Sequence, residues 1–289
     1  MAGVVEGASG LRIVVMAQRL AVLGSPIAHS LSPVLHRAAY SVLGLDWSYD
    51  AVEVGRDELS EFVSSRDASW RGLSLTMPLK RDILSMLGEI SELARETGSA
   101  NTVMFDQGVL RGFNTDVYGL TEGFARHGRH SLSSVLILGG GATAASALVA
   151  TARIGAKTVF VGVRSTERAT PLIDVGRAQG IDVQLRSLDQ LVQIDEALDA
   201  VVSTLPNGAA ASIVLDPDTV RTAALFDVAY SPWPTPLAAS WTGEEVIGGL
   251  EMLVLQALAQ VRIFVAGDPE HALDRDDEVL AAMLAAVGL

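Results

Sequence analysis

Apolar and polar residues follow two periods along the chain, and these periods alternate in a regular order. In the first half, short apolar runs with strand-like alternation precede stretches in which apolar residues recur about every three to four positions, as in amphipathic helices. We predict strands at 19–23, 47–53 and 72–76, helices at 34–43, 56–64 and 79–87, and a hairpin joining 101–105 to 109–114. The first half is therefore predicted to be an α/β unit with a mixed sheet.

The second half repeats strand and helix more regularly, after a polar, basic linker at residues 126–130. Strands are predicted at 134–138, at 158–163 and near Val183, Val201 and Ala224, with a helix at 143–154. This order is typical of a Rossmann-like, doubly wound parallel sheet. Two helices then end the chain, and we expect them to pack back on the first domain, with a cleft between the two domains.

Composition narrows the functional classes. The 289 residues carry 34 Asp and Glu against 21 Lys and Arg, a net charge of −13, which disfavours binding to nucleic acid or an anionic membrane surface. The absence of cysteine excludes disulfides, thiolate metal sites and cysteine nucleophiles, and the five histidines have no metal-ligand spacing, so we predict no metal. Polar residues interrupt the most apolar stretch, 250–266, which indicates a buried helix and a cytoplasmic protein.

A glycine-rich turn is the strongest local motif in the second half. Gly139, Gly141 and Ala144 fit the pattern GxGxxA between a predicted strand and a predicted helix. A dinucleotide pyrophosphate requires small residues there, because backbone N–H groups at the helix N-terminus must approach it. A glycine triplet alone is also consistent with a flexible turn, but this position favours a nucleotide site.

The next strand ends in a cation, where NAD-binding folds usually place an acidic residue for the ribose hydroxyls. Arg164 follows this strand, with Ser165, Thr166 and Arg168 close behind. A guanidinium suits a 2′-phosphate, which favours NADP over NAD, whereas the structural alternative is a solvated arginine on a loop.

Polar residues in the first half have ordinary structural explanations when each is taken alone. Ser30 and Ser32 precede a helix, where serine followed by proline is common capping chemistry, and Asp116 could cap the helix that follows it. Strand alternation puts Thr76 on a polar face, and the chain then turns toward Lys80. A lone lysine is more often a surface charge than a catalyst.

Taken together, these segments resemble the shikimate dehydrogenase family over residues 19–289. The matching segments are 22–33, 75–80, 100–103, 112–116, the glycine turn at 139, 227–232 with 235–237, and 252–257. The resemblance implies a substrate-binding, catalytic domain at 19–117, an NADP-binding domain at 118–249 and closing helices at 250–289. We expect residues 1–18 to form a disordered extension.

The family resemblance also implies roles for individual residues. Substrate contacts are implied for Ser30, Ser32, Thr76, Asn101, Tyr230 and Gln256, of which the two serines hold the carboxylate. Cofactor contacts are implied for Gly139, Gly140, Gly141, Ala142, Arg164, Ser165, Arg168 and Gly249. Lys80 and Asp116 are implied to form a catalytic dyad. A ketone that becomes an alcohol needs hydride on carbon and a proton on oxygen, and a lysine ammonium beside an orienting carboxylate can supply that proton.

Three positions depart from the family pattern. Ser74 stands where Asn is common, Arg37 follows His36 where Asn is usual, and Val163 replaces the Asn of an Asn-Arg-Thr phosphate motif. The first departure affects substrate contacts and the last affects cofactor affinity or selectivity.

The resemblance implies reversible reduction of 3-dehydroshikimate to shikimate with NADPH, in the pathway to chorismate and the aromatic amino acids. A quinate/shikimate dehydrogenase using NAD remains an alternative, and so does a catalytically silent member that binds a nucleotide or a ring acid. The expected partner is the small-molecule substrate, and a homodimer rests on analogy alone.

Overall fold

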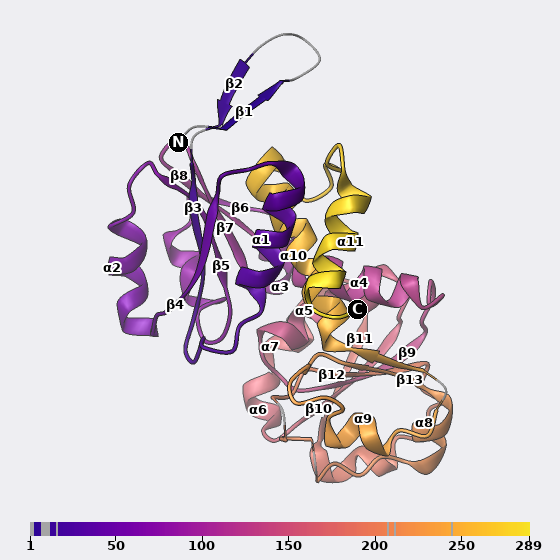
Figure 1. Ribbon diagram of the computed structural model, residues 1–289. Helices are drawn as coiled ribbons and strands as arrows, with labels where there is room; N and C mark the ends of the chain where they lie inside the picture. The colour runs from indigo at the N-terminus through magenta and orange to yellow at the C-terminus, as the bar shows by residue number, and fades with distance from the viewer. Residues whose placement is uncertain (1–2, 7–11, 16, 207, 211, 244) are drawn as a thin grey trace. The chain divides into compact units, whose positions relative to one another are not determined.

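The computed structural model describes residues 3–6, 12–15, 17–206, 208–210, 212–243 and 245–289 (Figure 1). The chain divides into two compact units: unit 1 comprises Met1–Thr115 and Val254–Leu289, and unit 2 comprises Asp116–Leu253. The domain boundaries predicted at 117 and 249 lie a few residues from these divisions.

Unit 1 is built on a six-stranded mixed sheet with the order β4-β3-β5-β7-β8-β6. Its strands are β3 (Arg19–Gly24), β4 (Ser48–Glu53), β5 (Trp70–Leu75), β6 (Glu89–Ile90), β7 (Thr102–Asp106) and β8 (Val109–Phe113). β3 runs parallel to β4 and β5, whereas β7 runs antiparallel to β5 and β8. The mixed α/β sheet predicted for the first half is confirmed. Because of these directions, the carboxyl ends of β3 and β5 and the amino end of β7 meet at one edge of the sheet.

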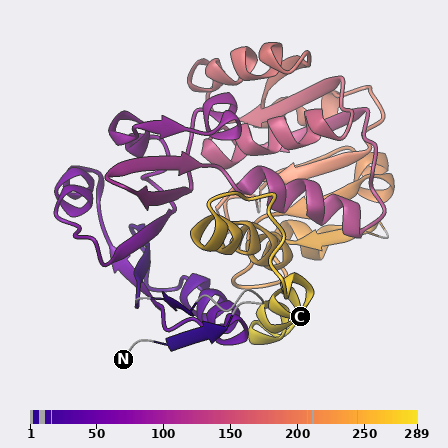
Figure 2. The same ribbon diagram turned by 90° about the horizontal axis from the view of Figure 1, so that it is seen from above.

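The helices of unit 1 cover this sheet. They are α1 (Ser32–Leu43), α2 (Leu59–Ser64), α3 (Glu92–Thr97), the part of α10 (Gly249–Ala266) that follows Leu253, and α11 (Asp276–Ala286), with 3₁₀ turns η1 (Arg56–Glu58) and η2 (Asp82–Met86). α1 and α11 lie side by side in both ribbon views (Figures 1 and 2). α10 presses so closely on β5 that a Cβ atom at Gly72 would come within 2.3 Å of the Phe264 ring.

Three details of unit 1 differ from the predicted elements. Residues 79–87 form turns and the 3₁₀ segment η2 in place of a helix, although Leu79 and Ile83 are both fully buried and so produced the helical spacing. β6 was not predicted, since a two-residue strand leaves almost no periodic signal. The six-residue helix α3 was not predicted either. The predicted hairpin is present, and its turn residues Gln107 and Gly108 have φ angles of 48° and 85°, as a primed turn requires.

The N-terminal extension lies partly outside the described residues. Within it, β1 (Gly3–Glu6) and β2 (Arg12–Val15) pair with each other in antiparallel register, where the sequence predicted disorder. In the described part of the chain, these two strands form a sheet of their own.

Unit 2 is a six-stranded parallel sheet with the order β11-β10-β9-β12-β13-β14. Its strands are β9 (Ser134–Leu138), β10 (Thr158–Val163), β11 (Asp182–Ser187), β12 (Ala200–Ser203), β13 (Ala224–Asp227) and β14 (Val246–Gly248). The predicted Rossmann-like sheet is confirmed. β14, three residues long, was not predicted. From β9 the chain passes to β10 on one side, and it later returns to β12 on the other side of β9. This reversal creates a topological switch point, where such sheets bind ligands.

Helices complete unit 2. They are α4 (Asp116–Arg126), α5 (Ala142–Arg153), α6 (Thr166–Ala169), α7 (Pro171–Ala178), α8 (Pro217–Thr222) and α9 (Pro236–Ser240), with the 3₁₀ segment η3 (Leu188–Gln193). α5 follows β9 directly and packs against α4 and α7.

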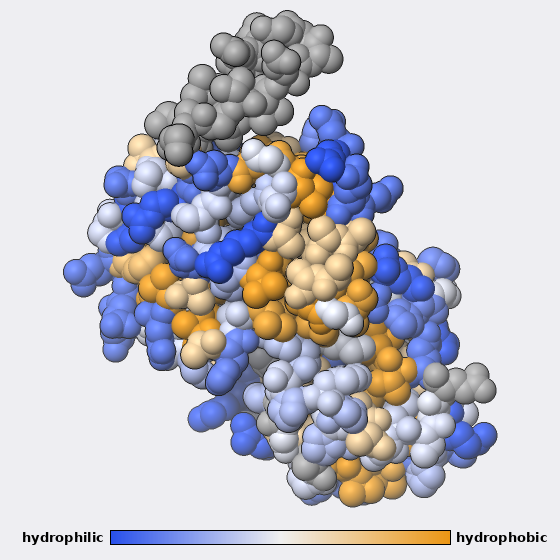
Figure 3. Space-filling model, viewed as in Figure 1, coloured by the Kyte–Doolittle hydropathy of each residue, from blue (hydrophilic) through white to orange (hydrophobic). Residues whose placement is uncertain are grey.

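The surface mixes polar and apolar residues on the face that Figure 3 displays. Large exposed apolar side chains among the described residues are Val34, Met77, Val109, Val192, Val214, Trp233 and Leu289. Among the described residues, α10 is long and apolar enough to cross a membrane, and 67% of it is buried, as in the core helix of a globular protein.

Candidate active site

The two serines predicted to contact a carboxylate lie between β3 and α1. Ser30 Oγ accepts a hydrogen bond from the Ser32 backbone N–H at 3.3 Å. The helix begins at Ser32, and its cap position, Leu31, makes no side-chain capping bond. Ser30 therefore accepts from the first backbone N–H of the helix, which agrees with the capping explanation, whereas Ser32 already belongs to the first turn and does not cap it.

Thr76 and Lys80 lie at the carboxyl end of β5. Thr76 N–H donates to Leu23 O on β3 at 2.9 Å, and a Cβ atom at Gly24 would meet the Thr76 methyl group at 2.4 Å. Lys80 lies in the turn that follows, is half-buried, and its carbonyl accepts from Ala100 N–H at 2.8 Å. The close approach at Gly24 thus keeps the ends of β3 and β5 together.

Asn101 joins three segments of unit 1 at the amino end of β7. Its Oδ1 atom accepts from the Thr115 backbone N–H at 2.9 Å, and its Nδ2 atom donates to Thr115 Oγ1 at 2.9 Å and Gln256 Oε1 at 3.4 Å. Its carbonyl accepts from Leu75 N–H at 2.7 Å. The structure therefore brings Asn101 and Gln256 into contact, next to the chain segment that carries Thr76.

A buried hydrogen-bond network, which was not predicted from the sequence, lies behind these residues. Gln260, one turn after Gln256 on α10, accepts at Oε1 from Ser74 Oγ at 2.8 Å and hydrogen-bonds His36 Nε2 at 3.1 Å. Burial lowers the pKa of His36 to about 3, so this imidazole is neutral near pH 7. The sequence contained one indication of this network, because Gln256 and Gln260 lie one turn apart in a mainly apolar helix.

Asp116, Tyr230 and Gly249 belong to unit 2. Asp116 begins α4 and is only 4% exposed. Tyr230 lies in the loop after β13, and partial burial raises the pKa of its phenol. A Cβ atom at Gly249 would lie 2.0 Å from the Val228 carbonyl oxygen, so glycine is required for the close approach between this loop and the start of α10.

Asp227 fixes the loop that carries Tyr230. Thr235 Oγ1 donates to Asp227 Oδ2 at 2.5 Å, and Ala229 N–H donates to Oδ1 at 3.2 Å. Desolvation raises the pKa of Asp227, while these hydrogen bonds partly oppose the shift. Thr235 also caps α9 by accepting from Ala238 N–H at 3.0 Å, so one carboxylate and one hydroxyl anchor both ends of the loop.

A cavity of about 430 Å³ lies at the carboxyl ends of β9 and β10 in unit 2. It is lined by Gly139, Gly140, Val163, Arg164, Ser165, Arg168, Ala169, Leu188 and Leu205. Five of the eight residues predicted to bind cofactor, Gly139, Gly140, Arg164, Ser165 and Arg168, are brought together here. Gly141 and Ala142 follow at the start of α5, whereas Gly249 lies elsewhere in unit 2.

Backbone geometry at the glycine turn fits a dinucleotide phosphate. Gly139 has a φ angle of 113°, and a Cβ atom there would lie 2.4 Å from Thr204 Oγ1. At Gly141, the cap position of α5, a Cβ atom would meet nothing within 4 Å, which leaves open space before the N-terminus of the helix. Free N–H groups at such a terminus attract anions, so the turn has both the space and the donors that a pyrophosphate needs.

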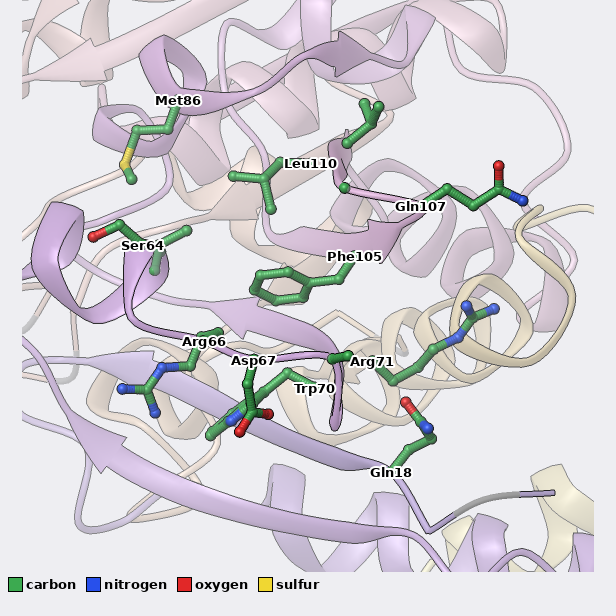
Figure 4. A pocket seen from close by; sticks show the side chains of 14 residues that line it. Gln18, Ser64, Arg66, Asp67, Trp70, Arg71, Met86, Phe105, Gln107 and Leu110 are labelled. Atoms are coloured by element: carbon green, nitrogen blue, oxygen red, sulfur yellow. The ribbon is translucent and has the colours of Figure 1, made fainter.

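A larger cavity, of about 600 Å³, lies at the opposite end of the unit 1 sheet (Figure 4). Phe105 and Leu110 lie on one side of it and Trp70 on the other, near the amino end of β5 and the carboxyl end of β7. The predicted substrate residues of unit 1 are absent from its lining, so we place the candidate site at the other edge of the sheet. In the described part of the chain, no cluster of three or more His, Cys, Asp or Glu could hold a metal ion.

Comparison with known proteins decides the family. The profile of the shikimate dehydrogenase substrate binding domain matches residues 22–103. The shikimate dehydrogenase (NADP(+)) of Geobacter metallireducens is 33% identical to this chain, over 91% of this chain and 96% of its own length. The chain belongs to the shikimate dehydrogenase family.

Solved members of the shikimate dehydrogenase family share its architecture. The crystal structure of Mycobacterium tuberculosis shikimate dehydrogenase is 36% identical, matches with a TM-score of 0.82, and covers 93% of this chain and 99% of that chain. The shikimate 5-dehydrogenase of Thermus thermophilus, solved in complex with NADP(H) and shikimate, is 29% identical with a TM-score of 0.77, covering 93% and 99%. The family resemblance inferred from sequence is confirmed over nearly the whole chain.

Proposed function

We propose that this protein is an NADP-dependent shikimate dehydrogenase that reversibly reduces 3-dehydroshikimate to shikimate with NADPH, in the pathway to chorismate and the aromatic amino acids. One observation carries the proposal: a chain of this family has a glycine turn and an arginine in one cavity at the switch point of unit 2. The turn suits a pyrophosphate, and Arg164, with Ser165 and Arg168, suits a 2′-phosphate.

The proposed substrate site uses the sheet edge of unit 1. Ser30 and Ser32 hold the carboxylate, with Tyr230 as a further contact, while Thr76, Asn101 and Gln256 bind the ring hydroxyls. The hydrogen bonds among Asn101, Thr115 and Gln256 support this proposal, because they hold polar side chains in fixed orientations before a substrate binds. Such preorganisation reduces the entropy that binding must overcome.

Lys80 and Asp116 are the proposed catalytic pair. Bound NADPH supplies the hydride for the ring carbon. The Lys80 ammonium stabilises negative charge on the ketone oxygen and donates a proton to it, and Asp116 orients the ammonium. In the oxidative direction the neutral amine of Lys80 accepts the alcohol proton.

We place the protein in the cytoplasm, with small-molecule substrate and cofactor as its partners. A homodimer is proposed by analogy with the family.

The test of the proposed function is a set of initial rates with shikimate or quinate, each combined with NADP or NAD. We expect the highest kcat/KM with shikimate and NADP. A preference for quinate with NAD would instead identify a quinate/shikimate dehydrogenase, and inactivity of folded protein that still binds either ligand would indicate a silent binding member.

A further inference from the structure

The larger cavity of unit 1 has walls that suit an apolar ring. Its volume of about 600 Å³ is that of a small-molecule site. Phe105 and Trp70 lie on opposite sides of it (Figure 4). Six apolar side chains, from α2, β5, η2, β7 and β8, contribute to the lining: Val63, Trp70, Met86, Phe105, Val109 and Leu110.

Two charged residues of the lining, Arg66 and Asp67, are engaged by their neighbours. Arg66 donates from Nε to the Phe62 carbonyl at 2.8 Å and from Nη2 to Ser65 Oγ at 2.8 Å. The Asp67 carboxylate accepts from the Ser69 backbone N–H at 2.9 Å. Both side chains therefore have a structural partner within the loop that follows α2.

Arg71, the third charged residue of the lining, has donors to spare. Its Nε donates to the Phe264 carbonyl at 2.6 Å, which fixes the side chain against α10. Among the described residues, its two terminal nitrogens form no hydrogen bond or ion pair. Asp106, the carboxylate that acts on Arg71, already pairs with Arg111 at 3.3 Å. Since Arg71 is half-buried and stays charged, an anion that enters the cavity would be stabilised beside it.

Polar and apolar residues are separated within this cavity. Figure 4 shows Arg71, Gln18 and Gln107 on one side and the side chains of Met86 and Phe105 on the other. The two glutamines add amide donors on the side of the guanidinium. The lining thus matches a ligand that carries an apolar ring at one end and an anionic group at the other.

We propose that this cavity binds a small monocarboxylate with an apolar ring. The carboxylate pairs with the terminal nitrogens of Arg71, whose planar fork matches its two oxygens, and the ring lies between Phe105 and Trp70. The hydroxylated ring of shikimate does not suit these walls, because its hydroxyls would lose water without gaining partners. The cavity is therefore a second site, at the end of the sheet opposite the candidate active site, and this inference does not depend on the proposed function.

The test is an NMR titration of the full-length protein with 3-phenylpropionate and with its uncharged analogue, 3-phenylpropanamide. We expect a Kd below about 1 mM for the carboxylate and a Kd about tenfold higher for the amide, because only the carboxylate forms a charge-assisted pair. The indole N–H signal of Trp70 should shift on binding, whereas that of Trp241 in unit 2 should not. Saturating shikimate should change the Kd by less than about twofold, since it binds elsewhere. A carboxylate Kd above about 1 mM, equal affinity for the amide, or competition by shikimate would each overturn the proposal.

Arg71→Met removes the charge while it keeps most of the side-chain length. We expect the Kd for 3-phenylpropionate to rise about tenfold and the Kd for the amide to change by less than about threefold. If loss of the bond to Phe264 merely disturbed the fold, both Kd values would rise together, and the proposal would fail. Arg66→Met is the matched control, because Arg66 also lines the cavity but is already engaged, and it should raise the Kd for 3-phenylpropionate by less than about threefold.

Ser64→Trp tests the cavity without changing a core residue. Ser64 is exposed at the end of α2 and lines the cavity, so an indole there should occupy the space and raise both Kd values at least about tenfold. Ser65→Trp, at an exposed position outside the lining, should retain the wild-type Kd values. Equal Kd values in these two variants would show that the ligands bind outside this cavity.

Discussion

Gln260 and Asn101 are joined across unit 1 by a hydrogen bond from the Gln260 side-chain amide to the Asn101 carbonyl, 3.3 Å long. One turn earlier on α10, Gln256 accepts from the Asn101 side chain. The backbone and side chain of Asn101 are therefore both held by the same helix. Gln260 makes no proposed contact with substrate, yet it hydrogen-bonds Asn101, which does.

Replacing Gln260 with Leu tests this arrangement. The change removes one buried hydrogen bond each from Ser74 and Thr102, and each lost bond should cost about 0.5–1.5 kcal/mol of unfolding free energy. We expect a lower urea midpoint together with a higher KM for shikimate. Gln190→Leu, at an exposed position, serves as the control. Wild-type stability and KM in Gln260→Leu would show that the network does not support the site.

The glycine turn gives a prediction about stability and cofactor binding. Gly139→Ala places a Cβ atom 2.4 Å from Thr204 Oγ1 at a φ angle of 113°, so both the backbone and its neighbour are strained. We expect a loss of about 1–3 kcal/mol in unfolding free energy and a weaker affinity for NADP. At Gly141 an added Cβ atom meets no atom within 4 Å, so Gly141→Ala should retain the wild-type melting temperature. Equal melting temperatures for the two variants would contradict this geometry.

Much of unit 2 was predictable because its signals are local. The bounds of β9 and β10 agree with the predicted strands, and the glycine turn lies between β9 and α5 as expected. The network around Gln260 was not predictable in the same way. Ser74 and Gln260 are 186 residues apart in sequence, and only the folded sheet brings their side chains together. A helical spacing of Leu79 and Ile83 was likewise misleading, since burial alone does not decide between an α-helix and a 3₁₀ turn.

Cofactor selectivity should depend on Arg164. Arg164→Gln removes the proposed partner of the 2′-phosphate, and we expect the KM for NADP to rise at least about tenfold while the KM for NAD changes little. Arg177→Gln changes an exposed arginine on α7 that pairs with Asp174, so it should leave both KM values unchanged. A parallel rise for NADP and NAD in Arg164→Gln would argue against 2′-phosphate recognition.

His36 predicts how stability depends on pH. In the unfolded chain a histidine binds a proton below about pH 6.5, whereas the pKa of folded His36 is about 3, so acid favours the unfolded state. Between about pH 4 and 6, this residue should contribute a loss of about 1.4 kcal/mol for each pH unit of acidification. His36→Gln should flatten the pH dependence of urea unfolding by that amount. His271→Gln, at an exposed position, should preserve the wild-type slope, and an equal slope in all three proteins would show that His36 is not buried neutral.

Lys80 carries the proposed proton transfer. Lys80→Ala should lower kcat by about 100- to 10,000-fold while the protein stays folded, because general acid–base groups contribute that much. Lys157, the only other lysine in the sequence, is exposed, so Lys157→Ala is the natural control and should keep full activity. Near-normal turnover in Lys80→Ala would remove this lysine from the mechanism.

The most direct test of the proposed function is the reductive reaction itself. Purified protein is mixed with 3-dehydroshikimate and NADPH, the loss of reduced-nicotinamide absorbance is followed, and the product is identified by chromatography. We predict consumption of one NADPH for each shikimate formed. Folded protein that binds NADPH but leaves both 3-dehydroshikimate and NADPH unchanged would contradict the assignment of this chain as a shikimate dehydrogenase.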